Sequence, residues 1–273
     1  MAPKPGVASV FRKPEPSGLE IERRGQAAWL WLDRPEVRNA LDAGLVAALG
    51  AALGRLEREP EVRVLVLAGR GPAFCAGGDL ARMEEAAKMT RARSRAEAAG
   101  FARLLYRFYR HPKPLVARVH GAAYAGGMGL VAACDLVVAA EEAEFRLPEV
   151  RLGLVPAMIG PYLVRALGEA QARRYMLTGA RLSAREAERL GFVHECVPAA
   201  QLDTCVERLV ADLAAAGPAA LAETKRLLAR LSRVPISPRL AAETAALLAQ
   251  VRAGAEARER IRAFLERRSP ASG

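Results

Sequence analysis

Runs of apolar residues that alternate with other residues, or are rich in β-branched residues, predict strands in the first part of the chain. The strands expected on this basis are residues 27–33, 62–70, 113–121 and 136–140. Between the first two, residues 42–60 show helical periodicity, with Asp42 in the position of an N-cap and Pro60 as a stop signal. Strand and helix therefore alternate from the start of the chain.

Helical patterns dominate elsewhere. Residues 81–110 predict a long, charged helix whose tip is a candidate for a mobile lid, and helices follow from Pro156 to the end of the chain. An alternating first part followed by helices indicates an α/β core with an α-helical region packed on it. The expected division is a flexible lead-in over residues 1–18, an α/β core over 19–200 and a helical C-terminal region over 201–273.

Composition indicates a globular protein, because 52% of the residues are hydrophobic and charges of both signs are present. The longest uncharged apolar run, Gly121 to Cys134, is too short to span a bilayer. Residues 1–18 lack the apolar segment of a secretory signal. We therefore expect no membrane association and a cytoplasmic location.

The net charge of +11 suits an anionic partner, either nucleic acid or a phosphate-bearing small molecule. Arginines are spread over the whole length without a dense basic run, which makes nucleic acid the less favoured partner. The four cysteines form no C-x-x-C pair and have no histidine at metal-ligand spacing, so we expect buried thiols and no metal site.

Two glycine-containing segments, residues 74–80 and 124–130, share one design: a strand runs into a turn of small residues that opens a helix. Backbone N–H groups at a helix start lack intrahelical acceptors, and glycine lets a ligand approach them closely. Two such turns facing each other would offer two donors to one oxygen atom, as in an oxyanion hole, where each donor contributes about 3–4 kcal/mol to the transition state. The alternative is that the small residues serve only close packing of helix on strand.

A dinucleotide site is a further alternative, because residues 127–132, GMGLVA, fit the pattern G-x-G-x-x-A after a strand. However, too few residues separate this segment from the next strand for a full crossover helix, and no acidic residue is well placed beyond it. The pattern therefore disfavours a nicotinamide-dependent dehydrogenase.

Four segments together, residues 32–42, 71–80, 120–156 and 263–268, resemble the enoyl-CoA hydratase/isomerase, or crotonase, superfamily, in matching order over residues 20–268. The resemblance implies a crotonase-like spiral of ββα units with an α-helical C-terminal trimerisation region. It also implies trimers or dimers of trimers and an acyl-CoA thioester substrate of fatty acid metabolism. No separate cofactor is expected, because coenzyme A is part of the substrate.

The resemblance also assigns site residues. The amides of Gly78 and Gly126 would form the oxyanion hole, and Glu149 would be the catalytic acid–base group. Tyr124 and Gly129 are candidates for the acyl pocket. The positions implied for coenzyme A are Arg38 near its phosphates, the backbone around Ala40, Gly78, Asp79, Leu80 and Gly126, and Phe264 and Arg267 from a neighbouring subunit.

Family hydratases typically carry two glutamates, and Gly129 occupies the position of the first. Glu149 occupies the second, where an apolar pocket should raise its pKa toward neutrality. One carboxylate suffices for a Δ3,Δ2-enoyl-CoA isomerase, whereas residues 149–168 resemble bacterial hydratases of branched substrates such as methylglutaconyl-CoA. We favour a hydratase that adds water across the 2,3 double bond, with the isomerase as the alternative. A crotonase-fold protein that only binds acyl-CoA or RNA is the non-enzymatic alternative.

Overall fold

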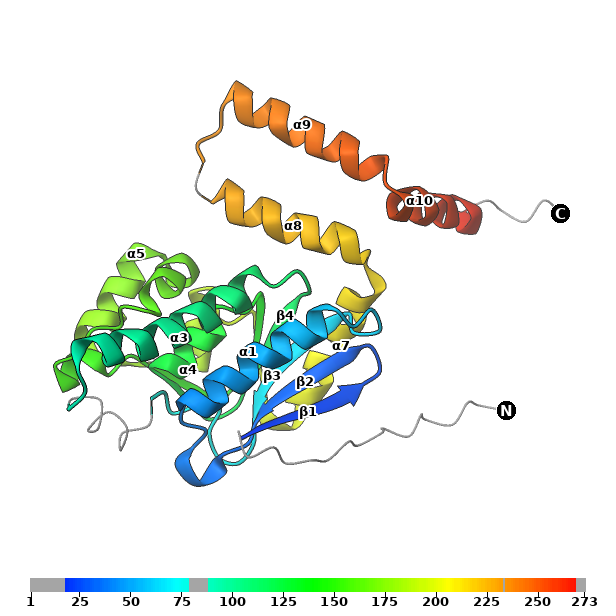
Figure 1. Ribbon diagram of the computed structural model, residues 1–273. Helices are drawn as coiled ribbons and strands as arrows, with labels where there is room; N and C mark the ends of the chain where they lie inside the picture. Colours follow the sequence, from blue (N-terminus) through cyan, green and yellow to red (C-terminus); the bar gives the residue numbers. More distant parts are fainter. Residues whose placement is uncertain (1–17, 79–87, 233, 269–273) are drawn as a thin grey trace, which may run out of the picture.

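The computed structural model describes residues 18–78, 88–232 and 234–268, and Figure 1 shows how its elements are arranged. The larger sheet has six strands within these residues, and all neighbours pair in parallel except the first two, which form an antiparallel hairpin. In spatial order they are β1 (Leu19–Arg24), β2 (Ala27–Leu32), β3 (Val64–Gly69), β4 (Leu115–Val119), β6 (Leu136–Ala140) and β9 (Glu195–Val197). The four expected strands are thus confirmed as β2, β3, β4 and β6.

A smaller sheet lies beside the first. It consists of β5 (Ala122–Tyr124), β7 (Glu144–Arg146) and β8 (Arg181–Ser183). β5 pairs in parallel with β7, and β8 pairs antiparallel with the other side of β7. Because β5 follows β4 directly, this sheet continues the chain from the large sheet into the second glycine turn.

Helices cover both faces of the large sheet. Leu30 and Leu67 face a core shared with α1 (Ala43–Glu57) and α3 (Arg91–Arg110), whereas Trp29 and Val66 face α7 (Leu202–Ala215). Successive residues of a strand point to opposite faces, so strands buried on both sides read as unbroken apolar runs.

The ends of these helices follow local rules. Asp42 caps α1, as expected, by accepting a hydrogen bond from the amide of Leu45 at 2.8 Å. The helix expected over residues 81–110 begins at Arg91, because the Thr90 side chain caps it by accepting from Arg93 N. Residues 79–87, and with them the tip suggested as a lid, lie outside the described residues.

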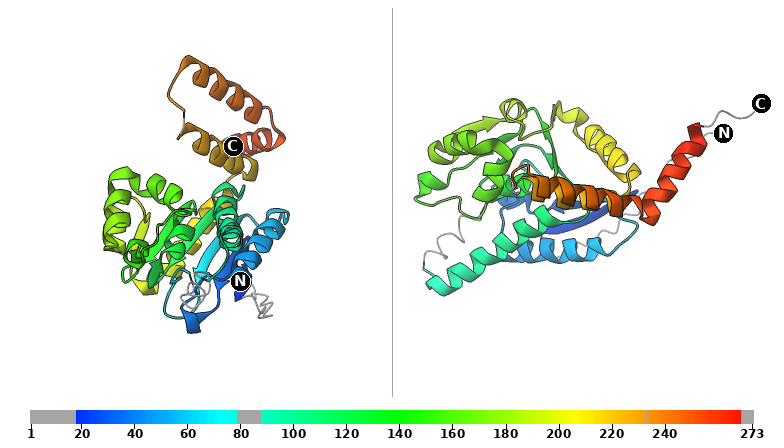
Figure 2. Two further views of the ribbon diagram at one scale, coloured as in Figure 1. Left: turned by 60° about the vertical axis from the view of Figure 1, so that its left-hand side comes forward. Right: turned by 90° about the horizontal axis from the view of Figure 1, so that it is seen from above.

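The remaining helices follow the core. They are α4 (Gly126–Ala132), α5 (Gly160–Thr178), α6 (Ala184–Arg189), α8 (Pro218–Leu231), α9 (Pro238–Arg252) and α10 (Ala255–Arg268), with 3-10 turns at Pro35–Val37, Glu149–Leu152 and Ala199–Gln201. Figures 1 and 2 show α8, α9 and α10 extending away from the sheets. The division into residues 19–200 and 201–273 stays a prediction.

Polar contacts attach α8 to the core and α10 to α8. Lys225 of α8 forms an ion pair with Asp135, with 2.5 Å between Nζ and Oδ2. Glu256 of α10 accepts hydrogen bonds from the amides of Ala219 and Ala220 at 2.9 and 3.1 Å, which satisfies the first turn of α8. No helix among the described residues combines the length and apolar character needed to cross a membrane.

Candidate active site

A cavity of about 890 Å³ lies between α1 and α3, and the first glycine turn, the start of α4 and the segment around residues 149–159 complete its walls. Most of its surface is apolar, which is typical of a site for a hydrophobic ligand. Among the described residues, its titratable lining groups are Asp42, Glu97, Arg103, Arg107 and Glu149.

The two glycine turns lie against each other, because Cys75 pairs with β5. Cys75 N donates to Ala122 O at 3.0 Å, and Tyr124 N donates to Cys75 O at 2.9 Å. A Cβ on Gly127 would lie 2.5 Å from the Cys75 carbonyl oxygen, so any larger residue would push the turns apart. Gly127 therefore allows close packing of the two turns, which was the alternative to an oxyanion hole in the sequence analysis.

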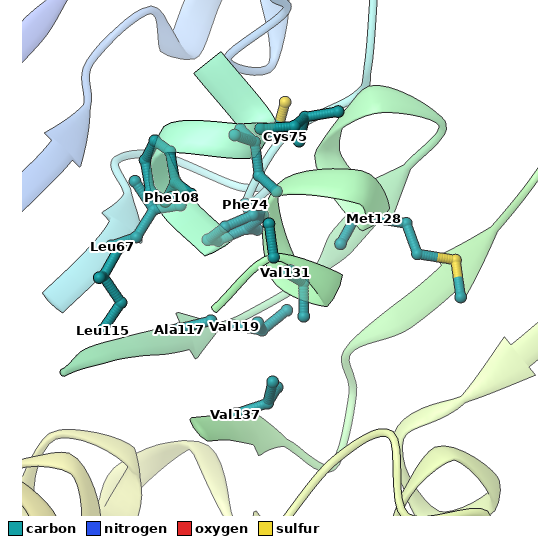
Figure 3. Close-up of a cluster of buried hydrophobic side chains, with 14 of the residues drawn as sticks. Leu67, Phe74, Cys75, Phe108, Leu115, Ala117, Val119, Met128, Val131 and Val137 are labelled. Atoms are coloured by element: carbon teal, nitrogen blue, oxygen red, sulfur yellow. The ribbon is translucent and has the colours of Figure 1, made fainter. Parts of the chain in front are cut away.

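The core under these turns anchors them. Figure 3 shows Phe74 and Cys75 from the first turn packed near Val131 of α4, above Ala117 and Val119 of β4. All five residues are fully buried. The turns are therefore fixed on a rigid base rather than on surface loops.

Gly78 and Gly126 present their backbones to the cavity. Gly126 is the first residue of α4, and the first intrahelical hydrogen bond runs from Gly129 N to Ala125 O. Within the described part of the chain, neither the Gly78 amide nor the Gly126 amide has a hydrogen-bond acceptor. Two unpaired donors on one cavity wall can bind a single carbonyl oxygen.

Ala125, which precedes these donors, has a strained backbone. Its φ and ψ angles are 46° and −118°, a region that residues with a side chain rarely adopt. Its amide donates to Arg146 O on β7 at 2.9 Å. This conformation turns the chain sharply from β5 into α4.

Asn39 is a further residue of this region that sequence reasoning missed. It is fully buried with a left-handed φ of 57°, and its side-chain amide donates to the carbonyls of Arg70 and Ala73, both at 2.8 Å. Its Oδ1 accepts from Arg34 N at 2.8 Å. Asn39 thus ties the loop before α1 to the segment that leads into Gly78; an asparagine, which tolerates the left-handed region, was the available signal.

Glu149 begins a 3-10 turn and lines the cavity. Its Oε2 is buried and has no hydrogen-bond partner within the described residues. Burial raises the pKa of this carboxyl above its ordinary value, because the apolar surroundings disfavour the charged form. A carboxyl whose Oε2 lacks a partner, in the same cavity as two unpaired amide donors, is suited to moving a proton.

Gly129 lies behind the cavity wall rather than on it. A Cβ at this position would lie 2.1 Å from Cγ2 and 2.8 Å from Cβ of Ile159, which does line the cavity. Any side chain at position 129 therefore requires Ile159 to move. Where the family pattern has its first glutamate, this protein has an isoleucine methyl group.

Tyr124 also lies away from the cavity wall, in contrast to the expectation that it lines the acyl pocket. Its hydroxyl donates to Glu144 on β7, and Arg181 pairs with the same carboxylate at 3.3 Å. Burial and the neighbouring Glu144 raise the pKa of the Tyr124 hydroxyl. Tyr124 holds the small sheet together.

The other expected coenzyme A positions are only partly described. Arg38 is exposed and its carbonyl accepts from Ala76 N at 2.9 Å, while Ala40 is buried beside the start of α1. Phe264, on α10, is 52% exposed and does not line the cavity of its own chain. Asp79, Leu80 and the side chain of Arg267 lie outside the described residues.

The four cysteines are free thiols. Burial raises the pKa of Cys75 to about 12, which keeps its sulfur protonated and unreactive. Over the described residues, no group of three or more histidine, cysteine, aspartate or glutamate side chains is arranged to hold a metal ion.

Comparison with known proteins identifies the family. Residues 22–272 match the family described as Enoyl-CoA hydratase/isomerase. The chain belongs to this family. A Thermus thermophilus relative named as an enoyl-CoA hydratase is 41% identical over 254 residues, which cover 92% of this chain and 99% of that protein. The 2,3-dehydroadipyl-CoA hydratase of Escherichia coli is 33% identical over 258 residues, covering 93% and 98%.

Solved structures agree with this assignment. The crystal structure of an enoyl-CoA hydratase from Shewanella pealeana superposes with a TM-score of 0.89 at 35% identity, covering 93% of this chain and 95% of that one. The protein therefore has the crotonase fold, a mixed α/β core with a C-terminal helical region, and is an enzyme of the enoyl-CoA hydratase/isomerase family.

Proposed function

We propose that the protein is an enoyl-CoA hydratase, which adds water across the 2,3 double bond of an acyl-CoA thioester. The observation that carries the proposal is the unpartnered Oε2 of Glu149, which lines the same cavity as the unpaired amides of Gly78 and Gly126. The hydratase names of the relatives support this choice of reaction.

In this proposal each group has one step. The thioester carbonyl oxygen binds between the two amides, which stabilise the negative charge that this oxygen gains as the enolate forms, each by about 3–4 kcal/mol. Glu149 carries the proton that is exchanged with the α-carbon, and its raised pKa lets it hold that proton closer to neutral pH. No separate cofactor is needed, because coenzyme A arrives as part of the substrate.

Coenzyme A would lie along the residues before α1, with Arg38 near its phosphates and Ala40, Asp79 and Leu80 at its adenine end. Phe264 and Arg267 of a neighbouring subunit would complete its site in a trimer or dimer of trimers. Large apolar side chains exposed on the extended helices would be buried in such an assembly: Leu228, Leu231, Leu248, Ile261 and Leu265. A cytoplasmic location and a branched substrate of the methylglutaconyl-CoA kind complete the proposal.

A Δ3,Δ2-enoyl-CoA isomerase is the second candidate, and the packing of Ile159 on Gly129 is the observation that favours it. An isomerase needs one base to move a proton from the α- to the γ-carbon, whereas the two-glutamate hydration scheme needs a carboxylate that position 129 does not provide.

The test offers the purified protein a 2-enoyl-CoA and a 3-enoyl-CoA in parallel and follows the ultraviolet absorbance of the conjugated thioester. Loss of absorbance from the 2-enoyl substrate supports the hydratase, and a gain from the 3-enoyl substrate alone supports the isomerase. Glu149→Gln should lower either activity by about 10²–10⁴-fold, because it removes the proton carrier but keeps the side-chain shape. Unchanged turnover in this variant would reject Glu149, and silence with straight and branched substrates would favour a binding-only protein.

A further inference from the structure

Hydration requires a group that takes a proton from water, and the position of the first family glutamate cannot supply one. Gly129 has no side chain, and Ile159 occupies the space in front of it. The side chain that lines the cavity at this place, Ile159, is therefore apolar. If the protein is a hydratase, as proposed above, the group that takes this proton comes from another element.

Within the described residues, three carboxylates line the cavity: Asp42, Glu97 and Glu149. Asp42 is already engaged through both oxygens. Its Oδ1 accepts from Leu45 N at 2.8 Å, and its Oδ2 pairs with Arg34 Nη1 at 3.1 Å. Removing it from these contacts would uncap α1, so Asp42 is a structural group.

Glu97 lies on the side of α3 that faces the cavity. Ser94, Phe101 and Leu104, which also line the cavity, share this stripe at spacings of three and four residues. Phe101 shows that this side of α3 faces the start of α4. Its ring atoms Cζ and Cε1 lie 3.3 and 3.4 Å from the position that a Cβ on Gly126 would take. Glu97 is thus one helical turn from the residue that contacts the second amide donor.

Glu97 is also available. In the described part of the chain no ion pair or hydrogen bond engages its carboxylate, although α3 carries many arginines. Glu97 is also an exposed residue. Glu97 and Glu149 thus line one cavity from two different elements, α3 and the 3-10 turn Glu149–Leu152.

We propose that Glu97 is the second carboxylate of the hydration reaction. Its ionised carboxylate takes a proton from water while the water oxygen bonds to the β-carbon of the enoyl thioester. The electron pair of the 2,3 double bond moves onto the thioester as an enolate held by the amides of Gly78 and Gly126. Protonated Glu149 then gives its proton to the α-carbon. Glu97 releases a proton to solvent and Glu149 takes one up, so the net reaction adds one water.

The test compares Glu97→Gln with Glu149→Gln in two assays on the full chain, hydration of a 2-enoyl-CoA and isomerisation of a 3-enoyl-CoA. Glu97→Gln should lower hydration by on the order of 100-fold or more while leaving isomerisation within a few fold, because isomerisation needs only one base. Glu149→Gln should lower both. Glu169→Gln is the matched control, since Glu169 is an exposed helical glutamate outside the cavity. Formate added to Glu97→Ala should restore part of the hydration, because the missing carboxylate can enter the open cavity.

Each other outcome decides against the proposal. Hydration by Glu97→Gln at the wild-type rate would overturn the role of Glu97 and leave the proposed hydratase standing. Equal loss of both activities in Glu97→Gln would show a role in binding or folding rather than in activating water. Absence of hydration in the wild type, alongside active isomerisation, would overturn the proposed hydratase and the role of Glu97 together.

Discussion

The contact between Gly129 and Ile159 predicts how the protein responds to one added methyl group. In Gly129→Ala the new Cβ would lie 2.1 Å from Cγ2 of Ile159, whereas carbon atoms in good contact are about 3.5–4.0 Å apart. Both residues are buried, with Ile159 3% exposed, so the clash has to be relieved inside the core. Overpacking of this kind costs about 1–3 kcal/mol. Replacing a helical glycine with alanine returns about 0.5–1 kcal/mol, so the expected net loss of stability is about 0–2.5 kcal/mol.

A double-mutant cycle with Ile159→Ala isolates this contact. Ile159→Ala alone should cost about 2–4 kcal/mol by leaving a cavity. In the double variant the methyl group added at position 129 enters that space. The loss of stability in the double variant should therefore be smaller than the sum of the two single losses by about 1 kcal/mol or more.

Urea unfolding at a fixed protein concentration measures each variant, because assembly would otherwise shift the midpoints. Gly100→Ala is the matched control: it also lies within a helix, and a Cβ there would meet nothing within 4 Å, so it should stabilise the protein by about 0.5–1 kcal/mol. A Gly129→Ala variant as stable as the Gly100→Ala control, or strict additivity in the cycle, would refute the proposed packing.

Two further predictions concern the active site. Asn39→Ala should destabilise the protein by about 2–4 kcal/mol, because it leaves the part-buried carbonyl of Arg70 and the buried carbonyl of Ala73 without this donor. It should also lower kcat, because the segment that leads into Gly78 loses the hydrogen bonds that hold it in place. Asn39→Gly relieves the left-handed backbone but does not restore these bonds, so it should lower kcat by the same factor. Wild-type kcat in both variants would contradict this role. Deuterium exchange at the α-carbon of a saturated acyl-CoA needs ionised Glu149, whose pKa is raised by burial, so kcat/KM for exchange should be full above that pKa and fall as pH decreases through it. The midpoint should lie above the ordinary glutamate value of 4.5, and a midpoint at or below 4.5 would contradict the burial argument.

Local signals predicted a large part of the fold. β2, β3, β4 and β6 were predictable because residues such as Trp29 and Val66 belong to apolar runs that any strand buried on both faces requires. The cap at Asp42 followed from the residue type at that position, and the small residues of 124–130 predicted the turn that opens α4. β1 was missed because four of its six residues are charged, and their role depends on the Trp side chains of β2: Arg24 lies 4.0 Å from the Trp29 ring.

The candidate site was predictable where a backbone turn or a motif defines it, as at Gly78, Gly126 and Glu149. It was not predictable where two distant segments meet. Nothing in the sequence near Gly129 indicates that Ile159 fills the space in front of it. The true partner of Tyr124, Glu144, likewise follows only from the pairing of β5 with β7.

The strained backbone of Ala125 places part of the free-energy cost of orienting the active site in folding rather than in the reaction. Holding a residue in such a conformation costs about 1–3 kcal/mol, and the hydrogen bond to Arg146 O and the packed core oppose its relaxation. In the proposed reaction the Gly126 N–H is thus oriented before any substrate arrives, and this dipole does not have to reorganise when charge develops on the thioester oxygen. Sequence changes that relax Ala125 would then raise the stability of the protein and slow its reaction. Selection for stability alone would therefore favour changes at this residue that lower activity.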